Sequence, residues 1–265
     1  METQNLTLSS DLQEVQEYWN EYINDIEVAR HEIGSREFFD ELEHYRYQKL
    51  AYLPQVVSFP GYKGKKVLEI GCGVGLDSLQ FARAGAELTA IDLTPNAITL
   101  AKRNLEVHGF QATFLNMNAE ALEFPDNHFD AVYSHGVLHH TPRPQQAIDE
   151  VLRVLKPGGE AVIMLYKKNS WMHLLTRIEG VHVEHEEKEA PVIFYYTCDE
   201  VHQLFAKFER VRLLIERYPH TTPKYSRMKA LLYNHIMVPV FHILPKALIR
   251  PLGAHIMIWA YKPGK

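Results

Sequence analysis

Residues 65–77 read KKVLEIGCGVGLD, and this stretch decides the fold. Its first half is a short apolar run without polar alternation, which predicts a strand covered on both faces. Its second half places glycine at 71, 73 and 75, before a helix that restarts near Leu76. Glycine lacks a Cβ atom and adopts unusual backbone angles, so a ligand could lie directly against such a loop. The stretch predicts a strand–loop–helix unit with a ligand beside the loop.

The chain downstream repeats this alternation of apolar strands and amphipathic helices. Further strands are predicted at 87–93, 112–119, 160–166, 210–218 and 255–263, and 129–140 is predicted to be a strand followed by a loop. The segment 95–109 opens with proline and closes with glycine, as helices commonly do. Alternating strands and helices predict an α/β fold whose parallel sheet is doubly wound, with helices on both faces.

Size and composition fit one generous α/β domain. The chain has 265 residues, of which 46% are hydrophobic and 23% charged, and its net charge is −5. We expect no nucleic-acid partner, because such partners usually require a basic excess. Cys72 and Cys198 are too few for a disulfide framework, which favours a reducing cytoplasm. The polar, acidic first residues do not resemble a secretory signal.

We expect three parts within this single domain. Residues 1–64 predict a helical cap, with Asp11 as N-cap and a break at 33–35. Residues 65–166 predict the ligand-binding core, and 167–265 the rest of the sheet with substrate-side insertions. Within the last part, 228–249 is apolar but interrupted by Asn, His and Pro, so it does not predict a membrane span. It predicts a lid or core helix pair, or an interfacial element that contacts a membrane.

Asp92 closes the second strand, 17 residues after Gly75. A carboxylate at this place can accept hydrogen bonds from the two hydroxyls of a ribose. The alternative is that the acid caps the next helix, but Thr94, directly before Pro95, is the better cap candidate. The spacing Gly71-x-Gly73-x-Gly75 also differs from the G-x-G-x-x-G dinucleotide fingerprint.

Four segments together resemble the class I S-adenosylmethionine-dependent methyltransferases, nearest to the small-molecule branch that includes quinone-biosynthesis enzymes. They are VLEIGCGVG (67–75), AIDLTP (90–95), NAEALEFPDNHFDAVYSHGVLHHTP (118–142) and EVLRVLKPGG (150–159). The resemblance covers about residues 65–165 and implies a Rossmann-like sheet of seven strands with an antiparallel last strand. HIMIWAYKP (255–263) fits that strand.

The resemblance also implies S-adenosyl-L-methionine as cofactor and a set of residues that hold it. Glu69 and the glycine loop would hold the methionine part and ribose, Asp92 the ribose hydroxyls, and Leu93 the adenine. Asn118 stands where many relatives have Asp. The full expected set is Glu69, Gly71, Cys72, Gly73, Gly75, Asp92, Leu93, Asn118, Ala119, Ser134, His135 and Arg46.

Catalytic help is expected mainly from histidines after the fourth strand. An activated methyl group requires alignment, and a base only where the nucleophile carries a firmly held proton. The candidates are His135, His139 and His140, with Tyr18, Tyr22 and Tyr47 from the cap. The alternative is that the histidines satisfy backbone groups and the tyrosines pack the core. No metal site is expected, since His182 and His185 have no third ligand nearby.

The expected function is methyl transfer to a small-molecule nucleophile: a thiol, an amine, a phenol or a quinone-like compound. Two alternatives remain open. One is a regulatory protein that binds the cofactor without catalysis. The other is a nicotinamide-dependent reductase, which the glycine spacing and the lack of a Tyr-x-x-x-Lys pair after the fourth strand disfavour. Oligomeric state is not predicted.

Overall fold

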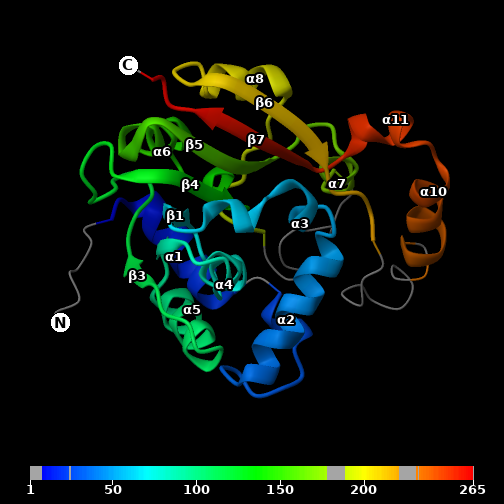
Figure 1. Ribbon diagram of the computed structural model, residues 1–265. Helices are drawn as coiled ribbons and strands as arrows, with labels where there is room; N and C mark the ends of the chain where they lie inside the picture. The colour runs from blue at the N-terminus through cyan, green and yellow to red at the C-terminus, as the bar shows by residue number, and fades with distance from the viewer. Residues whose placement is uncertain (1–7, 24, 178–188, 221–230, 232, 265) are drawn as a thin grey trace.

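The computed structural model describes residues 8–23, 25–177, 189–220, 231 and 233–264. Its centre is a seven-stranded sheet in the order β3-β2-β1-β4-β5-β7-β6 (Figure 1). The strands are β1 (Lys66–Ile70), β2 (Glu87–Asp92), β3 (Thr113–Asn116), β4 (Phe129–His135), β5 (Leu155–Tyr166), β6 (Glu209–Glu216) and β7 (His255–Tyr261). β7 runs antiparallel to both of its neighbours, whereas β1 to β5 pair in parallel. The predicted doubly wound sheet with an antiparallel last strand is confirmed.

Both faces of the sheet are buried, as the unbroken apolar strands predict. One face packs against α4 (Leu76–Arg83), α5 (Pro95–Val107) and the cap, with Phe81 and Ala101 among the buried residues. The other face packs against α6 (Pro144–Val154) and α8 (Cys198–Leu204), which contribute Val151 and Val201. Figure 1 shows these two groups of helices on opposite sides of the strands.

The N-terminal cap consists of α1 (Ser10–Glu21), the short η1 (Ile26–Val28), α2 (Arg36–Lys49), α3 (Leu53–Val56) and η2 (Phe59–Tyr62). The break expected at 33–35 is present, and Ser35 caps α2 by accepting a hydrogen bond from the N–H of Phe38. The prediction that Asp11 is the N-cap of α1 is wrong by two residues, because Ser9 occupies the N-cap position. Asp11 lies in the first turn instead, where its negative charge favours the helix N-terminus.

A second correction concerns Thr94. It occupies the N-cap position of α5, but its hydroxyl donates to Asp92 instead of capping the helix. β3 is also shorter than the predicted 112–119. It ends at Asn116, and Asn118 then turns the chain by accepting a hydrogen bond from the N–H of Glu120.

The C-terminal part places helical segments between β5 and β6 and again between β6 and β7. The first group is α7 (Trp171–Leu175) and α8; His182 and His185 lie outside the described residues. The second is η4 (Tyr233–Met237), α10 (Val238–Ile243), α11 (Lys246–Ile249) and η5 (Arg250–Leu252). Among the described residues, no helix has the length and apolar content needed to cross a membrane. The short η3 (Leu138–His140) follows β4.

Candidate functional site

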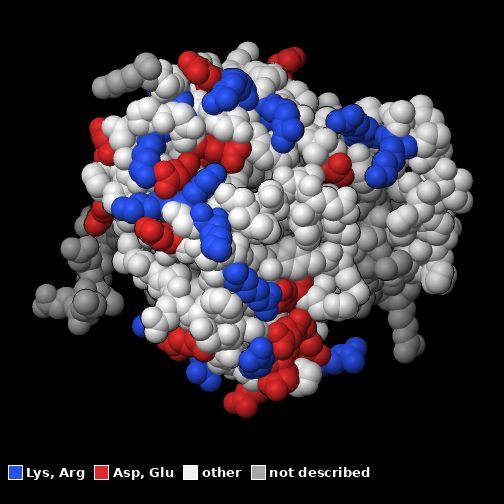
Figure 2. Space-filling view, in the orientation of Figure 1, with Lys and Arg blue, Asp and Glu red and all other residues white. Residues whose placement is uncertain are grey.

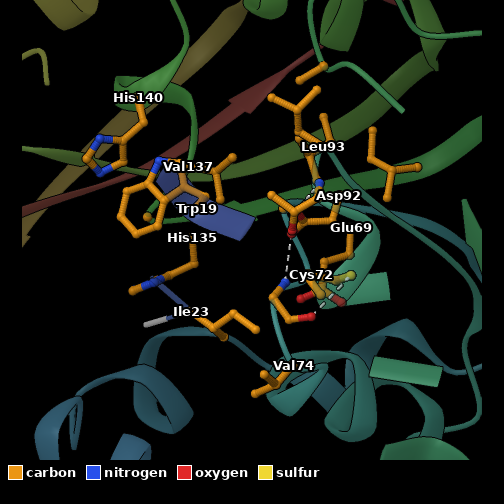
Figure 3. Close-up of a pocket in the computed structure, with 18 of the residues that line it drawn as sticks. Trp19, Ile23, Glu69, Cys72, Val74, Asp92, Leu93, His135, Val137 and His140 are labelled. Atoms are coloured by element: carbon orange, nitrogen blue, oxygen red, sulfur yellow. Dashed lines mark hydrogen bonds between the residues drawn. The ribbon is translucent and has the colours of Figure 1, made fainter. Parts of the chain in front are cut away.

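The main pocket lies beyond the carboxyl ends of β1, β2 and β4. The strand order reverses between β1 and β4, and ligands of open α/β sheets bind at such a switch point. Helices α1 and α2 cover the pocket from the cap. In Figure 3, Trp19, Ile23, His135 and His140 border one side, and Glu69, Cys72 and Asp92 lie on the opposite side.

The three glycines of the loop serve different purposes. All have positive φ, of 73° at Gly71, 52° at Gly73 and 77° at Gly75. A Cβ atom on Gly71 would lie 2.1 Å from Cγ2 of Val137, whereas one on Gly73 would meet no protein atom within 4 Å. Gly73 therefore leaves open space of the kind that a ligand requires.

Gly75 is absent from the pocket lining, so the structure does not support the binding role expected for it. A Cβ atom there would lie 3.0 Å from the Cα of Ala101. Glycine is required at position 75 because α4 packs closely on α5 there and because the backbone is left-handed.

Asp92 lines the pocket, and much of its hydrogen-bonding capacity is already used. Oδ1 accepts from the N–H and the hydroxyl of Thr94, at 2.9 and 2.8 Å, and Oδ2 accepts from the N–H of Gly73 at 3.0 Å. A carboxylate offers about four acceptor sites, so Asp92 has room for about one more donor. Burial raises the pKa of Asp92, while these hydrogen bonds act in the opposite direction.

Leu93, Asn118 and Ala119 also line the pocket, next to Asp92. The carbonyl of Leu93 accepts a hydrogen bond from the side chain of Gln16 at 2.7 Å, which ties α1 to this edge. Oδ1 of Asn118 accepts from the N–H of Glu120 at 2.9 Å and keeps a second lone pair.

Acidic side chains outnumber basic ones along the pocket wall. Glu69, Asp77 and Asp92 all line it, and Arg46 faces Asp77. Burial raises the pKa of Glu69 well above its usual value, with Asp77 adding to the shift. Burial would also raise the pKa of Asp77, but the charge of Arg46 and several hydrogen bonds lower it to about 2. Burial therefore favours the neutral form of Glu69, whereas Asp77 is held ionised beside Arg46.

The three candidate histidines are placed differently. His140 is 4% exposed and lines the pocket, and its Nδ1 lies 2.8 Å from the carbonyl oxygen of Val192. His135 lines the pocket from the end of β4. His139 does not: it is fully buried, with its ring 3.9 Å from that of Tyr166. Burial, with His140 next, holds the pKa of His139 well below 6.5, so it does not meet the expectation of a catalytic base.

Ser134 and the cap tyrosines also lie outside the pocket lining. Ser134 is fully buried and donates its hydroxyl to the carbonyl of Ile70. Tyr47 donates to Asp77 at 2.9 Å, so it supports the site from behind. Tyr18 is 2% exposed, and its ring packs 5.0 Å from those of Trp19 and Tyr22. Ser134, Tyr18, Tyr22 and Tyr47 were expected to contact a ligand directly. In the structure they contact other residues of the protein instead.

Six cap residues that were not expected in the site line the pocket instead: Leu12, Val15, Trp19, Ile23, Asp25 and Leu42. The ring of Trp19 lies 4.9 Å from that of His140, and Ile23 follows the end of α1. Their spacing from Val15 and Leu12 places all four on one face of the N-terminal segment, which is the signal that could have found them.

Comparison with known proteins supports the same region. Residues 68–163 match the methyltransferase-domain family. The chain is 28% identical over 200 residues to the ubiquinone biosynthesis O-methyltransferase of Dechloromonas aromatica, covering 74% of this chain and 85% of that one. It is 29% identical over 159 residues to the enzyme of the same name from Alkalilimnicola ehrlichii, covering 57% of this chain and 64% of that one, which is less than two thirds of its length.

Among solved structures, magnesium protoporphyrin IX methyltransferase from Synechocystis has the same fold, with a TM-score of 0.56 and 14% identity over 97% of this chain and 99% of that one. The matched residues 68–163 contain the glycine loop, Asp92, Asn118 and the histidine segment that follows β4. Residues 68–163 are therefore a methyltransferase domain, and through these residues and the seven-stranded sheet around them the chain is similar to the class I S-adenosylmethionine-dependent methyltransferases.

Proposed function

We propose that this protein transfers the methyl group of S-adenosylmethionine to a hydroxyl group of a small, partly apolar acceptor such as a phenol. The observation that carries the proposal is the contrast between the two sides of the pocket. One side presents Asp92 and the open space over Gly73, and the other presents the imidazole of His140 beside the ring of Trp19. The two relatives named above are O-methyltransferases by name.

The pocket residues fit this cofactor. Bound S-adenosylmethionine supplies a methyl group already activated on a positively charged sulfur. The acidic wall of Glu69, Asp77 and Asp92 favours that charge, and Arg46 offers a donor for the carboxylate of the methionine part. The remaining acceptor site of Asp92 suits one ribose hydroxyl, and Asn118 and Leu93 border the space for adenine.

In this proposal His140, which lines the pocket, takes the proton of the acceptor. Because a carbonyl only accepts, Nδ1 of His140 donates to Val192. Nε2 is then the basic nitrogen. The bound cofactor would supply the methyl group to the acceptor oxygen, and Nε2 of His140 would receive the hydroxyl proton that the acceptor loses. Trp19 helps to exclude water from this side.

Replacement of Asp92 tests the cofactor site. We expect Asp92→Ala to weaken binding of S-adenosylmethionine at least about tenfold, because a charged acceptor for a ribose hydroxyl is lost. Isothermal titration calorimetry measures the change. Glu87→Ala is the matched control, since Glu87 is an exposed carboxylate at the other end of the same strand. Equal affinities of the two variants for S-adenosylmethionine would show that Asp92 does not bind the cofactor.

A panel of acceptors tests the reaction class. Release of S-adenosylhomocysteine is measured with catechol, thiophenol and aniline as acceptors. We expect product with catechol. Turnover with only the thiol or the amine would overturn the assignment to oxygen, and the absence of product with all three would favour a protein that binds the cofactor without catalysis.

We also propose that the enzyme works in the cytoplasm and contacts the surface of an anionic membrane through the segment 228–249, of which the structure describes residues 231 and 233–249. Six large apolar side chains of this segment are exposed, from 40% at Leu244 to 82% at Ile243; they are Leu231, Ile236, Val240, Ile243, Leu244 and Leu248. Figure 1 shows α10 and α11 at the edge of the molecule, away from the strands. The corresponding side in Figure 2 is largely white, with Lys and Arg residues at its upper end.

Charge supports an anionic partner for this surface. Although the whole chain carries −5, residues 217–265 contain no Asp or Glu. Two cations of this stretch, Lys246 and Arg250, lie within or directly after the described part of the apolar segment, whereas Arg217 contacts His255 and Lys262 contacts Asn127. Exposed apolar side chains flanked by Lys and Arg are typical of segments that lie in the interface of an anionic bilayer.

Vesicle co-sedimentation tests this surface. We expect binding to vesicles that contain phosphatidylglycerol, weaker binding to pure phosphatidylcholine, and a loss of about tenfold in Ile243→Asp, because an apolar side chain no longer enters the bilayer. Ile33→Asp is the control, since Ile33 is 63% exposed in the cap. The same loss in both variants, or no binding by the unmodified protein, would contradict the proposal.

A further inference from the structure

Asn104 is a fully buried polar residue one turn before the end of α5, and it lies outside the pocket lining. Its side-chain nitrogen Nδ2 lies 2.9 Å from the carbonyl oxygen of Val74, which belongs to the glycine loop. A carbonyl only accepts, so the amide nitrogen of Asn104 faces Val74 and donates. The other polar atom, Oδ1, is buried without a hydrogen-bond partner in the described part of the chain.

Asparagine at this position costs folding free energy. Its amide is removed from water, and Oδ1 forms no bond that offsets this loss. Asparagine is also a weaker helix former than leucine. Nearly all buried polar groups of folded proteins have a partner, so a group without one points to a function or to strain. The hydrogen bond to Val74 is what the side chain gains in return.

The glycine loop, residues 71–75, depends on contacts of this kind for its shape. Gly71, Gly73 and Gly75 are all left-handed, and glycine loses more conformational freedom on folding than any other residue. From the β2 side, the carbonyl of Ile91 and the carboxylate of Asp92 accept hydrogen bonds from the N–H groups of the first and third loop residues, at 2.8 and 3.0 Å. These bonds hold the first half of the loop on β2.

Helix α5 contacts the second half of the loop at two places. A Cβ atom on Gly75 would lie 3.0 Å from the Cα of Ala101, and the carbonyl of Val74 accepts from Asn104. Residues three apart lie on one face of a helix, so Ala101 packs against Gly75 while Asn104 holds the neighbouring carbonyl. Val74 itself lines the pocket, next to the open space over Gly73 (Figure 3).

We propose that Asn104 is a positioning residue of the cofactor site. By donating to Val74 it fixes the second half of the glycine loop, and with it the surface that a ligand meets at Gly73 and Val74. The unpaired Oδ1 is then a loss of stability that is retained for the shape of the site. The inference rests on the proposed function for the identity of the ligand, and on the hydrogen bond for the role of Asn104.

Removal of the donor tests this role. Leucine has the branching of asparagine without its polar atoms, so Asn104→Leu removes the bond to Val74 and the unpaired Oδ1 together. We expect its affinity for S-adenosylhomocysteine, measured by calorimetry, to fall about tenfold. Its urea midpoint should shift little, because loss of the bond is offset by loss of the buried unpaired oxygen. Asn104→Ala, which adds no atoms, should show the same loss of affinity if the larger leucine does not fit.

Leu105→Ala is the matched control, because Leu105 is 1% exposed on the same helix and its side chain has no donor. This variant should lower the urea midpoint more than Asn104→Leu does, because it opens a cavity, and it should keep its affinity for S-adenosylhomocysteine within about twofold. An equal loss of affinity in the variants at 104 and 105, or an unchanged affinity in both variants at 104, would overturn the proposal and make Asn104 an ordinary core residue.

Amide hydrogen exchange tests the loop without any ligand. The N–H of Gly75 donates to the carbonyl of Cys72 at 2.9 Å within the loop. We expect this amide to exchange faster in Asn104→Leu than in the unmodified protein, while the amides of β1 keep their protection, because only local opening increases. Unchanged exchange at Gly75 would contradict the proposal whatever the binding result. If the unmodified protein does not bind S-adenosylhomocysteine, the proposed function fails, and hydrogen exchange alone decides whether Asn104 holds the loop.

Discussion

His140→Gln is expected to lower kcat by about 10²- to 10⁴-fold with catechol as acceptor. That range is typical for loss of a general base. Glutamine keeps a polar side chain but cannot take the hydroxyl proton into Nε2, which in the native protein is left basic by the bond from Nδ1 to Val192. Affinity for S-adenosylhomocysteine should stay within about twofold, because Asp92 and the glycine loop lie on the other side of the pocket.

Steady-state kinetics and calorimetry on the same preparations separate these two effects. His202→Gln is the control, since His202 is an exposed histidine on α8 and should leave kcat unchanged. If kcat of His140→Gln is close to that of the unmodified protein, His140 is not a general base. Methyl transfer would then depend on alignment of the reacting groups alone. A large loss of cofactor affinity in this variant would instead place His140 on the cofactor side.

The strands were predictable because each consists of a local apolar run. VLEI and VIML need no information from elsewhere in the chain to indicate a strand buried on both faces. The glycine loop and Asp92 were predictable for the same reason, since their spacing is short. The resemblance supplied the seven strands and the antiparallel β7, which the local pattern alone left open.

The choice among neighbouring side chains was not predictable. His139 and His140 are adjacent in one tight turn, where successive residues point about 120° apart, and only the surrounding packing decides which one faces the pocket. In the same way Trp19 lines the pocket while Tyr18 packs into the cap. Sequence spacing gives the face of a helix only once it is known what covers that face.

Contacts between residues that are far apart in the sequence could not be predicted either. Tyr52 and His255 are 203 residues apart and meet at 2.7 Å because the cap folds back on the end of β7. Asp77 was not a candidate, although four donors from two elements, α2 and β4, converge on it. Asp77 lies in the first turn of α4, where an acidic side chain stabilises any helix, so its position in the sequence did not indicate a role in the site.

Asp77→Ala is expected to destabilise the protein by about 3 to 5 kcal/mol, because it leaves the partly buried charge of Arg46 without its partner. Asp77 is 3% exposed and accepts hydrogen bonds from Arg46, Tyr47 and Tyr133, the last at 2.7 Å. Urea denaturation measures the loss. The control is Asp126→Ala, whose exposed pair with Arg153 should contribute no more than about 1 kcal/mol.

The same carboxylate makes part of the stability depend on pH. The pKa of Asp77 is lowered to about 2 in the folded protein, against about 3.9 in an unfolded chain. Its contribution, on the order of 2 kcal/mol, is therefore fully present above pH ~4 and is lost as the pH falls through about 2. The unfolding free energy of Asp77→Ala should vary less across this window than that of the unmodified protein. Parallel curves would mean that Asp77 is not held ionised by Arg46, and that Arg46 is positioned in the pocket by other contacts.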